Sequence, residues 1–252
     1  MTKRIRVLDA NIDTHSLPET IIQIEHHIKA RKPIHHVGVN ADKINLMKKN
    51  PVFKKIINDS TLINPDGMSM VLAARILKKP VIDRVAGIDV MTQLLEVAAE
   101  KGYRVYFLGT SEAILRKMVI KVKQDYPTLK IVGYQNGFFK QNEEASVVEG
   151  VKKAKADILF VALPSPKKEF FIDKHMEEMA VPISIGVGGS FDVIAGELKR
   201  APMWMQNVNL EWLYQMIQEP KRLAKRYIIG NTVFLGHILR EKLTRKSEVE
   251  IG

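Results

Sequence analysis

The sequence predicts an α/β fold in which three layers of secondary structure surround a mostly parallel sheet. Six short apolar segments alternate with helical patterns over the first two-thirds of the chain, as in a parallel sheet with crossover helices. No strand pattern follows Pro202, where helical patterns alone continue. We therefore expect a three-layer, Rossmann-like α/β domain over residues 1–200 and a basic helical appendage over residues 201–252.

The predicted strands are runs of β-branched and other apolar residues, and turn residues stand at both ends of each run. They cover residues 34–39, 61–64, 103–108, 129–132, 157–163 and 182–187. Capping signals place the helices: Ser16 to Glu19 form a capping box, Asn40 can cap a helix, and Gly102 can end one. The expected helices cover residues 18–30, 41–49, 68–78, 88–101, 112–126, 142–155, 168–179, 203–218 and 221–243. Six strands are too few for an eight-stranded barrel.

Composition narrows the class of protein. The 252 residues contain no cysteine, which excludes disulfides and thiolate metal sites and fits a cytoplasmic protein. Charges interrupt the apolar residues at the N-terminus, so we expect no signal peptide, and no apolar stretch is long enough to span a bilayer.

The positive charge of the chain is concentrated near its C-terminus. The formal net charge is +11, and residues 199–246 hold ten Lys or Arg against three Glu. Such a segment is typical of proteins that bind a polyanion, namely anionic lipid, nucleic acid or a phosphorylated substrate. Trp204, Trp212, Tyr214 and Tyr227 interleave with these charges, which suits an interfacial helix or an amphipathic helix packed on its own core.

Polar residues follow five of the predicted strands. Because the carboxyl ends of parallel strands meet at one edge of a sheet, we expect these residues to share the edge where ligands of such sheets bind. The set comprises Asn40, Asp66 with Gly67, Gly109 with Thr110, Ser165 to Glu169, and Gly186 to Asp192.

Several of these residues allow both a structural and a chemical interpretation. Asp66 can be a turn residue or helix cap, or a general base at the mouth of the sheet. Residues 186–192 read Gly-Val-Gly-Gly-Ser-Phe-Asp and fail the dinucleotide fingerprint at Phe191, which leaves a plain turn or a glycine loop that approaches phosphate. Gly109 and Thr110 can simply precede a helix cap or can receive an anion.

Isolated cations are also candidates for an anion site. Arg84 can clamp a diphosphate or be a solvated charge. Lys167 and Lys168 stand at a predicted helix start, where cations are disfavoured, so an anionic ligand or a solvated pair is expected. The seven histidines show no metal-ligand spacing, and Asp-x-Asp is absent, so no metal is implied.

Ordered motifs over residues 34–227 give a resemblance to a known family. The chain resembles the WecG/TagA/CpsF glycosyltransferases, glycosyltransferase family 26. The shared motifs are Asn40-Ala-Asp, Asn64-Pro-Asp-Gly67, Arg84-Val-Ala-Gly87, Pro166-Lys-Lys-Glu169, residues 186–196, Arg200-Ala-Pro202, Trp204-Met-Gln206, residues 210–214, Glu219-Pro-Lys-Arg222 and Arg226-Tyr227.

The resemblance implies an inverting, metal-independent transferase that needs no cofactor. It would move N-acetylmannosamine or its uronic acid from a UDP-sugar to a polyprenyl-diphosphate-linked N-acetylglucosamine, in the synthesis of teichoic acid or other cell-surface polysaccharide. Asp66 matches the family's proposed base, and Asn40 and Arg84 match pocket positions. Donor binding is expected from Gly67, Gly109, Thr110, Lys168, Glu169, Gly186, Gly188, Gly189 and Asp192, and contact with the lipid diphosphate or membrane from Arg200, Arg222 and Arg226.

Two positions depart from the family pattern. A threonine is common where this chain has Gly38, and Pro-Lys-Gln-Glu reads Pro166-Lys-Lys-Glu169 here. Lys168 thus replaces a neutral amide with a cation, and an acidic donor sugar is one explanation.

The expected partners follow from this reading. They are the UDP-sugar, the lipid-linked acceptor and an anionic membrane surface, with the chain peripheral on the inner face of the cell membrane. Self-association through the appendage stays open. A nucleotide-dependent oxidoreductase and a non-enzymatic polyanion-binding module are the alternatives, although no nucleic-acid recognition motif is present.

Overall fold

The centre of the fold is a six-stranded sheet, all of whose strands are parallel. The structure is a computed structural model that describes residues 4–80, 83–207 and 210–250, except the side chains of residues 206–207, 221–227 and 245–250. The strand order is β4-β3-β8-β7-β5-β6, so the first strands along the chain lie at one edge. The strands are β3 (Ile34–Val39), β4 (Leu62–Pro65), β5 (Arg104–Gly109), β6 (Lys130–Gln135), β7 (Ile158–Ala162) and β8 (Ile183–Gly186).

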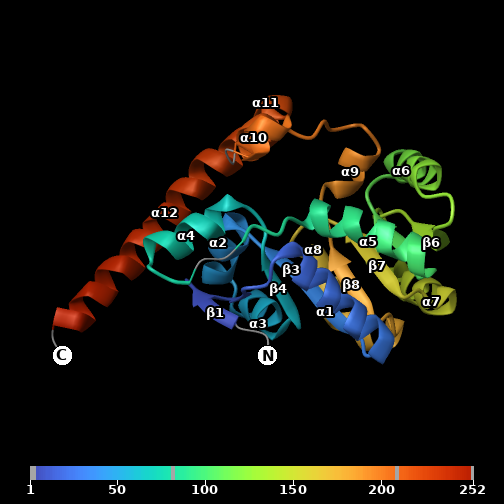
Figure 1. The fold of residues 1–252 in the computed structure, drawn as a ribbon, viewed down its shortest axis with the longest axis horizontal. Helices are drawn as coiled ribbons and strands as arrows, with labels where there is room; N and C mark the ends of the chain where they lie inside the picture. Colours follow the sequence, from blue (N-terminus) through green and yellow to red (C-terminus); the bar gives the residue numbers. More distant parts are fainter. Residues whose placement is uncertain (1–3, 81–82, 208–209, 251–252) are drawn as a thin grey trace.

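Helices cover both faces of the sheet and complete the three predicted layers (Figure 1). One face packs against α1 (Leu17–Ala30), α5 (Gly87–Lys101) and α6 (Glu112–Asp125) through a continuous apolar core. The other face packs against α2 (Ala41–Lys49), α3 (Pro51–Asp59) and α4 (Met68–Ile76) at one end, and against α7 (Glu144–Ala154) and α8 (Lys167–Met179) at the other. The predicted fold class is therefore confirmed.

The predicted capping signals act as expected. Ser16 and Glu19 form the capping box of α1, and the Asn40 side chain caps α2 by accepting from the Lys43 amide. Gly102 ends α5 in the left-handed conformation that a glycine adopts without strain. These local signals fix where the helices begin and end.

Five elements were not predicted. An antiparallel hairpin precedes α1, formed by β1 (Arg4–Val7) and β2 (Ala10–Asp13). Helix α3 follows α2 directly because Asn50 caps it and Pro51 occupies its first turn. The glycine loop after β8 ends in a short helix, α9 (Ser190–Ile194), and a 3-10 turn (Gln141–Glu143) precedes α7.

The C-terminal region is helical, as predicted, but divides differently. The single helix expected over residues 203–218 is two helices, α10 (Met203–Asn207) and α11 (Glu211–Gln218), and α12 (Pro220–Glu250) follows. Phe234 and Ile238 of α12 are buried in the core beside α2 and α4, and Asn45 of α2 donates to the Gly230 carbonyl at 2.9 Å. The rest of α12 extends away from the sheet towards the C-terminus (Figure 1).

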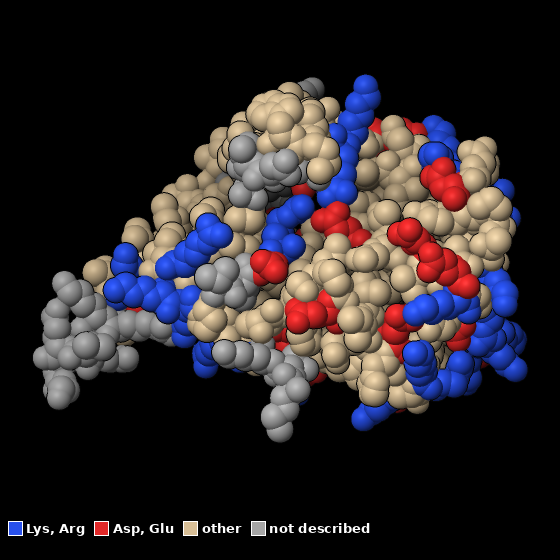
Figure 2. Space-filling model, viewed as in Figure 1, with Lys and Arg blue, Asp and Glu red and all other residues tan. Residues whose placement is uncertain are grey.

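One side of α12 is apolar and exposed, and its Leu235 also lies at the edge of the large cavity described below. Ile228, Leu235, Leu239 and Leu243 are solvent-exposed large apolar residues spaced seven or four positions apart, so they share one side of the helix. Figure 2 shows uncharged side chains along the outer edge of this helix, with Lys and Arg side chains gathered below it. Within the described residues, no helix is both long and apolar enough to cross a bilayer.

Candidate active site

A large open cavity lies at the carboxyl edge of the sheet. Its volume is about 1280 Å³, which exceeds the roughly 300–1,000 Å³ typical of small-molecule sites. Its walls come from the strand ends, from α2 and α4, and from the C-terminal helices α11 and α12. The predicted site residues that line it are Asn40, Asp66, Gly67, Arg84, Lys168, Gly186, Gly188, Gly189, Asp192 and Arg200.

Asp66 stands at the end of β4, facing this cavity. Its backbone amide donates to the Val39 carbonyl at 2.8 Å, which ties the residue to the end of β3. Its Oδ1 atom accepts from the Gly87 amide at 3.3 Å, and Gly67 begins the turn into α4 with φ of 115°. Asp66 is thus not a helix cap, and its other carboxylate oxygen, Oδ2, is the one nearer to Gly38.

Asn40 caps α2 and also lines the cavity. Its Oδ1 atom accepts from the Lys43 amide at 3.2 Å, so the structural interpretation of this residue holds. The Nδ2 group of the same amide is a donor that the cap does not use. One side chain can therefore cap the helix and contact a ligand.

A buried charge cluster lies under the cavity floor. Lys43 and Lys168 approach the same oxygen of Glu169, with Nζ to Oε1 distances of 3.0 and 3.2 Å. All three residues are buried, and Ser165 donates to the second carboxylate oxygen at 2.8 Å. Two ammonium groups share one carboxylate, so the cluster carries one positive charge in excess.

The pKa values reflect this arrangement. Burial and, to a lesser extent, the neighbouring Lys43 lower the pKa of Lys168 to about 8, while Glu169 opposes the change. Burial alone would raise the pKa of Glu169, but Lys43 and Lys168 hold it at about 2. Glu169 therefore stays ionised, and both lysines of the cluster border the cavity.

The glycine loop after β8 exposes its backbone to the cavity. Gly188 has φ of 54°, and no other group lies within 4 Å of where a Cβ atom would stand at Gly188 or Gly189. At Gly186, a Cβ atom would come within 3.0 Å of the Lys168 side chain, so the glycine makes room for that lysine. The loop can approach phosphate, and Asp192 stands at its end on the cavity wall.

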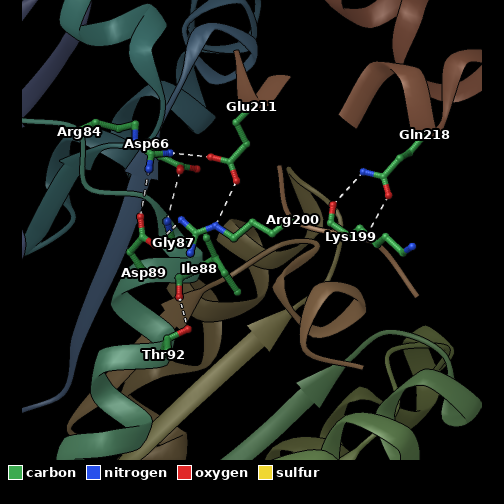
Figure 3. A network of polar contacts seen from close by, with 10 residues as sticks. All are labelled: Asp66, Arg84, Gly87, Ile88, Asp89, Thr92, Lys199, Arg200, Glu211 and Gln218. Carbon is green, nitrogen blue, oxygen red and sulfur yellow. Dashed lines mark hydrogen bonds and ion pairs between the residues drawn. The ribbon is translucent and has the colours of Figure 1, made fainter. Parts of the chain in front are cut away.

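Arg84 and Arg200 meet at the rim of the cavity in a closed ring of ion pairs (Figure 3). Arg84 lies 2.8 Å from Glu211 and 3.3 Å from Asp89, and Arg200 lies 3.3 Å and 2.5 Å from the same two carboxylates. We call these four residues the arginine ring. It joins the segment before α5, the first turn of α5, the linker after α9 and the first residue of α11.

Other predicted residues do not line the cavity. Gly109 and Thr110 lie against β7, where a Cβ atom on Gly109 would come within 2.5 Å of Ala162, and the Thr110 amide donates to the Ala162 carbonyl. Ser111 caps α6, so this turn has the structural role considered above. Glu169 lies beneath the cavity surface, and the side chains of Arg222 and Arg226 lie outside the described residues.

The sequence patterns did not single out Lys43, Asp89 or Glu211. Lys43 follows Asn40 by three positions on α2, a spacing that places it beside the cap. Asp89 and Glu211 come together only through the fold. Among the described residues, no group of three or more His, Asp or Glu is placed to hold a metal ion.

Comparison with known proteins identifies the group to which this site belongs. The sequence model of the Glycosyl transferase WecG/TagA/CpsF family matches residues 5–248. The chain belongs to this family. The resemblance seen in the sequence is thereby confirmed, and the chain is a glycosyltransferase. Neither the oxidoreductase nor the polyanion-binding alternative is favoured.

Curated relatives carry one common name. Each is an N-acetylglucosaminyldiphosphoundecaprenol N-acetyl-beta-D-mannosaminyltransferase. The protein from Bacillus spizizenii is 36% identical over 73% of this chain and 71% of its own length, and that from Bacillus subtilis is 35% identical over 76% and 73%. The Staphylococcus aureus protein is 28% identical over 89% of this chain and 88% of its own length.

Proposed function

We propose that this glycosyltransferase moves N-acetylmannosamine, or its uronic acid, from a UDP-sugar to a polyprenyl-diphosphate-linked N-acetylglucosamine. The observation that carries the proposal is the placement of Asp66 in a cavity that cations and a glycine loop also line. The names of the relatives support the acceptor and the sugar. The volume of the cavity suits two sugars and a diphosphate better than a single small metabolite.

The proposed reaction is a single displacement with inversion. The Asp66 carboxylate takes the proton from an acceptor hydroxyl as that oxygen attacks the anomeric carbon of the donor. The bond between the anomeric carbon and the diphosphate oxygen breaks, and UDP leaves with the electron pair. Arg84, Lys168 and the glycine loop at Gly188 and Gly189 line the cavity where they can stabilise the developing negative charge, as metal-independent catalysis requires.

We further propose that the C-terminal helices hold the chain against an anionic membrane, on the inner face of the cell membrane. Exposed Trp204 and Trp212 lie on α10 and α11, and α12, which follows them in the chain, has an exposed apolar side. Apolar and aromatic residues beside Lys and Arg are typical of helices that lie in the membrane interface. This placement would bring the cavity to the lipid-linked acceptor.

The decisive experiment is a donor panel with a short-chain lipid-diphosphate N-acetylglucosamine acceptor. The panel contains UDP-N-acetylmannosamine, UDP-N-acetylmannosaminuronic acid, UDP-N-acetylglucosamine and UDP-glucose. We expect acceptor-dependent UDP release from one of the first two donors, at the same rate with and without chelator. The absence of release from every donor, with folded full-length protein and membrane present, would refute the proposal.

A further inference from the structure

The arginine ring connects the C-terminal helices to a residue of the cavity. Glu211 is the first residue of α11, yet its Oε2 atom contacts Arg84, which is 127 positions earlier. Its Oε1 atom contacts Arg200, so the carboxylate bridges two arginines with separate oxygens. Asp89 does the same from the first turn of α5, with Oδ2 on Arg84 and Oδ1 on Arg200.

Arg84 depends on these contacts for its orientation. It lies between α4 and α5 in a stretch that is neither helix nor strand, where the Val85 amide donates to the Pro65 carbonyl. Both carboxylates that hold its guanidinium group belong to the first turns of helices, where the helix dipole favours a negative charge. The four side chains are between 16% and 31% exposed, so solvent screens these ion pairs less than fully exposed pairs.

The ring leaves Arg84 able to bind a ligand. Each carboxylate takes one of its five N–H groups, and the others remain available to an anion. The ring holds two positive and two negative charges, so it fixes the guanidinium group without adding net attraction for a phosphate. Its contribution is therefore orientation, which affects the transition state more than the initial binding of an anion.

We propose that Glu211 is a positioning residue of the active site, which orients Arg84 towards the diphosphate of the donor. This inference rests on the proposed function. It makes α11 part of the catalytic apparatus through one carboxylate, independently of any contact that the C-terminal helices make with a membrane.

The test compares Glu211→Gln with Glu197→Gln in the transferase assay. Glu197 lies in the linker that leads to Arg200 and forms an exposed ion pair with Lys117. The control variant therefore loses a similar carboxylate, but one that is not part of the arginine ring. We expect Glu211→Gln to lower kcat by about tenfold or more, since a small misorientation of a catalytic group has effects of this size. The donor KM should stay unchanged or fall, because the ring gains one positive charge. A rise in KM at unchanged kcat would overturn the proposal.

A double-mutant cycle separates positioning from a purely structural role. If Glu211 acts through Arg84, the variant with both Arg84→Gln and Glu211→Gln is no slower than Arg84→Gln alone. If the loss of kcat in the double variant equals the product of the two single losses, the proposal is overturned. Thermal unfolding of each variant shows whether the fold is retained.

Amide hydrogen exchange tests the role of Glu211 even if the proposed transferase activity is not found. If the wild type transfers sugar, the kinetic comparison decides whether Glu211 positions Arg84. If the wild type transfers none, the proposed function fails, and amide exchange over residues 84–89 still tests the contact. Exchange there should be faster in Glu211→Gln than in Glu197→Gln, and equal rates in the two variants would overturn the positioning role.

Discussion

Gly38 lies against Asp66 so closely that a Cβ atom at position 38 would stand 2.7 Å from the Cβ atom of Asp66. Real Cβ atoms essentially never make a contact this short, so the aspartate would have to move. The family often has threonine at this position. In this chain, the glycine leaves the space that the Asp66 side chain occupies.

Replacing Gly38 with alanine should displace the Asp66 carboxylate. We expect Gly38→Ala to lower kcat by about tenfold to a hundredfold, because a displacement of about 1 Å has effects of this size. Steady-state kinetics with the preferred donor measures this loss. Gly150→Ala is the matched control, since its added Cβ atom on α7 meets only the Tyr106 hydroxyl at 3.9 Å. Full activity of Gly38→Ala would show that Asp66 tolerates the shift.

Removing the charge of Asp66 should stop turnover without disturbing the fold. Asp66→Asn keeps the shape of the side chain and an oxygen that can accept from the Gly87 amide. General-base catalysis contributes typically 10²–10⁴-fold, so we expect a loss in that range. Thermal unfolding should be nearly unchanged. Near-wild-type transfer by this variant would contradict the assignment of Asp66 as the base.

The buried lysine should give transfer an alkaline limit. Because burial lowers the pKa of Lys168 to about 8, the side chain is charged below that pH and neutral above it. Its positive charge faces the cavity, so kcat should decline as the pH rises through about 8. Lys168→Gln should be slower at pH 7 and should lack this decline. A pH profile that is identical in the two proteins would show that Lys168 does not act on the reaction.

Two buried histidines should make the fold sensitive to mild acid. Burial lowers the pKa of His35 to about 3 and that of His36 to about 4, so both are neutral in the folded chain at pH 6. The unfolded chain takes up these protons near pH 6.5, and stability is lost as the pH falls from there towards 4. Each histidine contributes up to about 1.4 kcal/mol per pH unit in this window.

Urea unfolding between pH 7.5 and 4.5 measures this loss. His36 lies 2.7 Å from Asn64, so His36→Gln keeps a hydrogen-bonding side chain near that amide. This variant should show a shallower dependence of the unfolding free energy on pH than the wild type. An equal slope in both proteins would mean that His36 does not account for the acid sensitivity.

The apolar side of α12 should be needed for binding to anionic vesicles. Leu235, Leu239 and Leu243 are exposed, and burying a leucine side chain contributes about 1.5–3 kcal/mol. Replacing the three with serine should weaken vesicle binding at least about tenfold, as co-sedimentation would measure. Ile120→Ser on α6 is the control, since the exposed fraction of Ile120 lies within the range of the three leucines but the residue is on another helix. Unchanged binding of the triple variant would place the membrane contact elsewhere.

The sheet was predictable because buried parallel strands are nearly continuous apolar runs. The hairpin of β1 and β2 was not, because its stability depends on contacts with distant segments. Asp13 is fully buried there, pairs with Arg4 at 2.6 Å and accepts from the Ile63 amide at 2.7 Å. A charged residue in a short segment gives no local sign that such partners exist.

The same distinction applies to the site. Residues at or directly after the ends of strands, such as Gly186 and Asp66, could be assigned to one edge because strand direction alone brings them together. The pairing of Arg84 with Glu211 depends on how α11 packs, which local periodicity does not encode. Lys168 was singled out by its odd position at a helix start, and its ion pair with Glu169 stabilises a cation there against the effects of burial and of Lys43.

The burial of Phe234 and Ile238 has a consequence for biosynthesis. These residues close the core beside α2 and α4, and both also line the cavity. A ribosome releases them only after it has completed every strand of the sheet. The nascent chain therefore carries an uncovered apolar surface on α2 and α4 until α12 has left the ribosome, when this wall of the substrate chamber becomes complete.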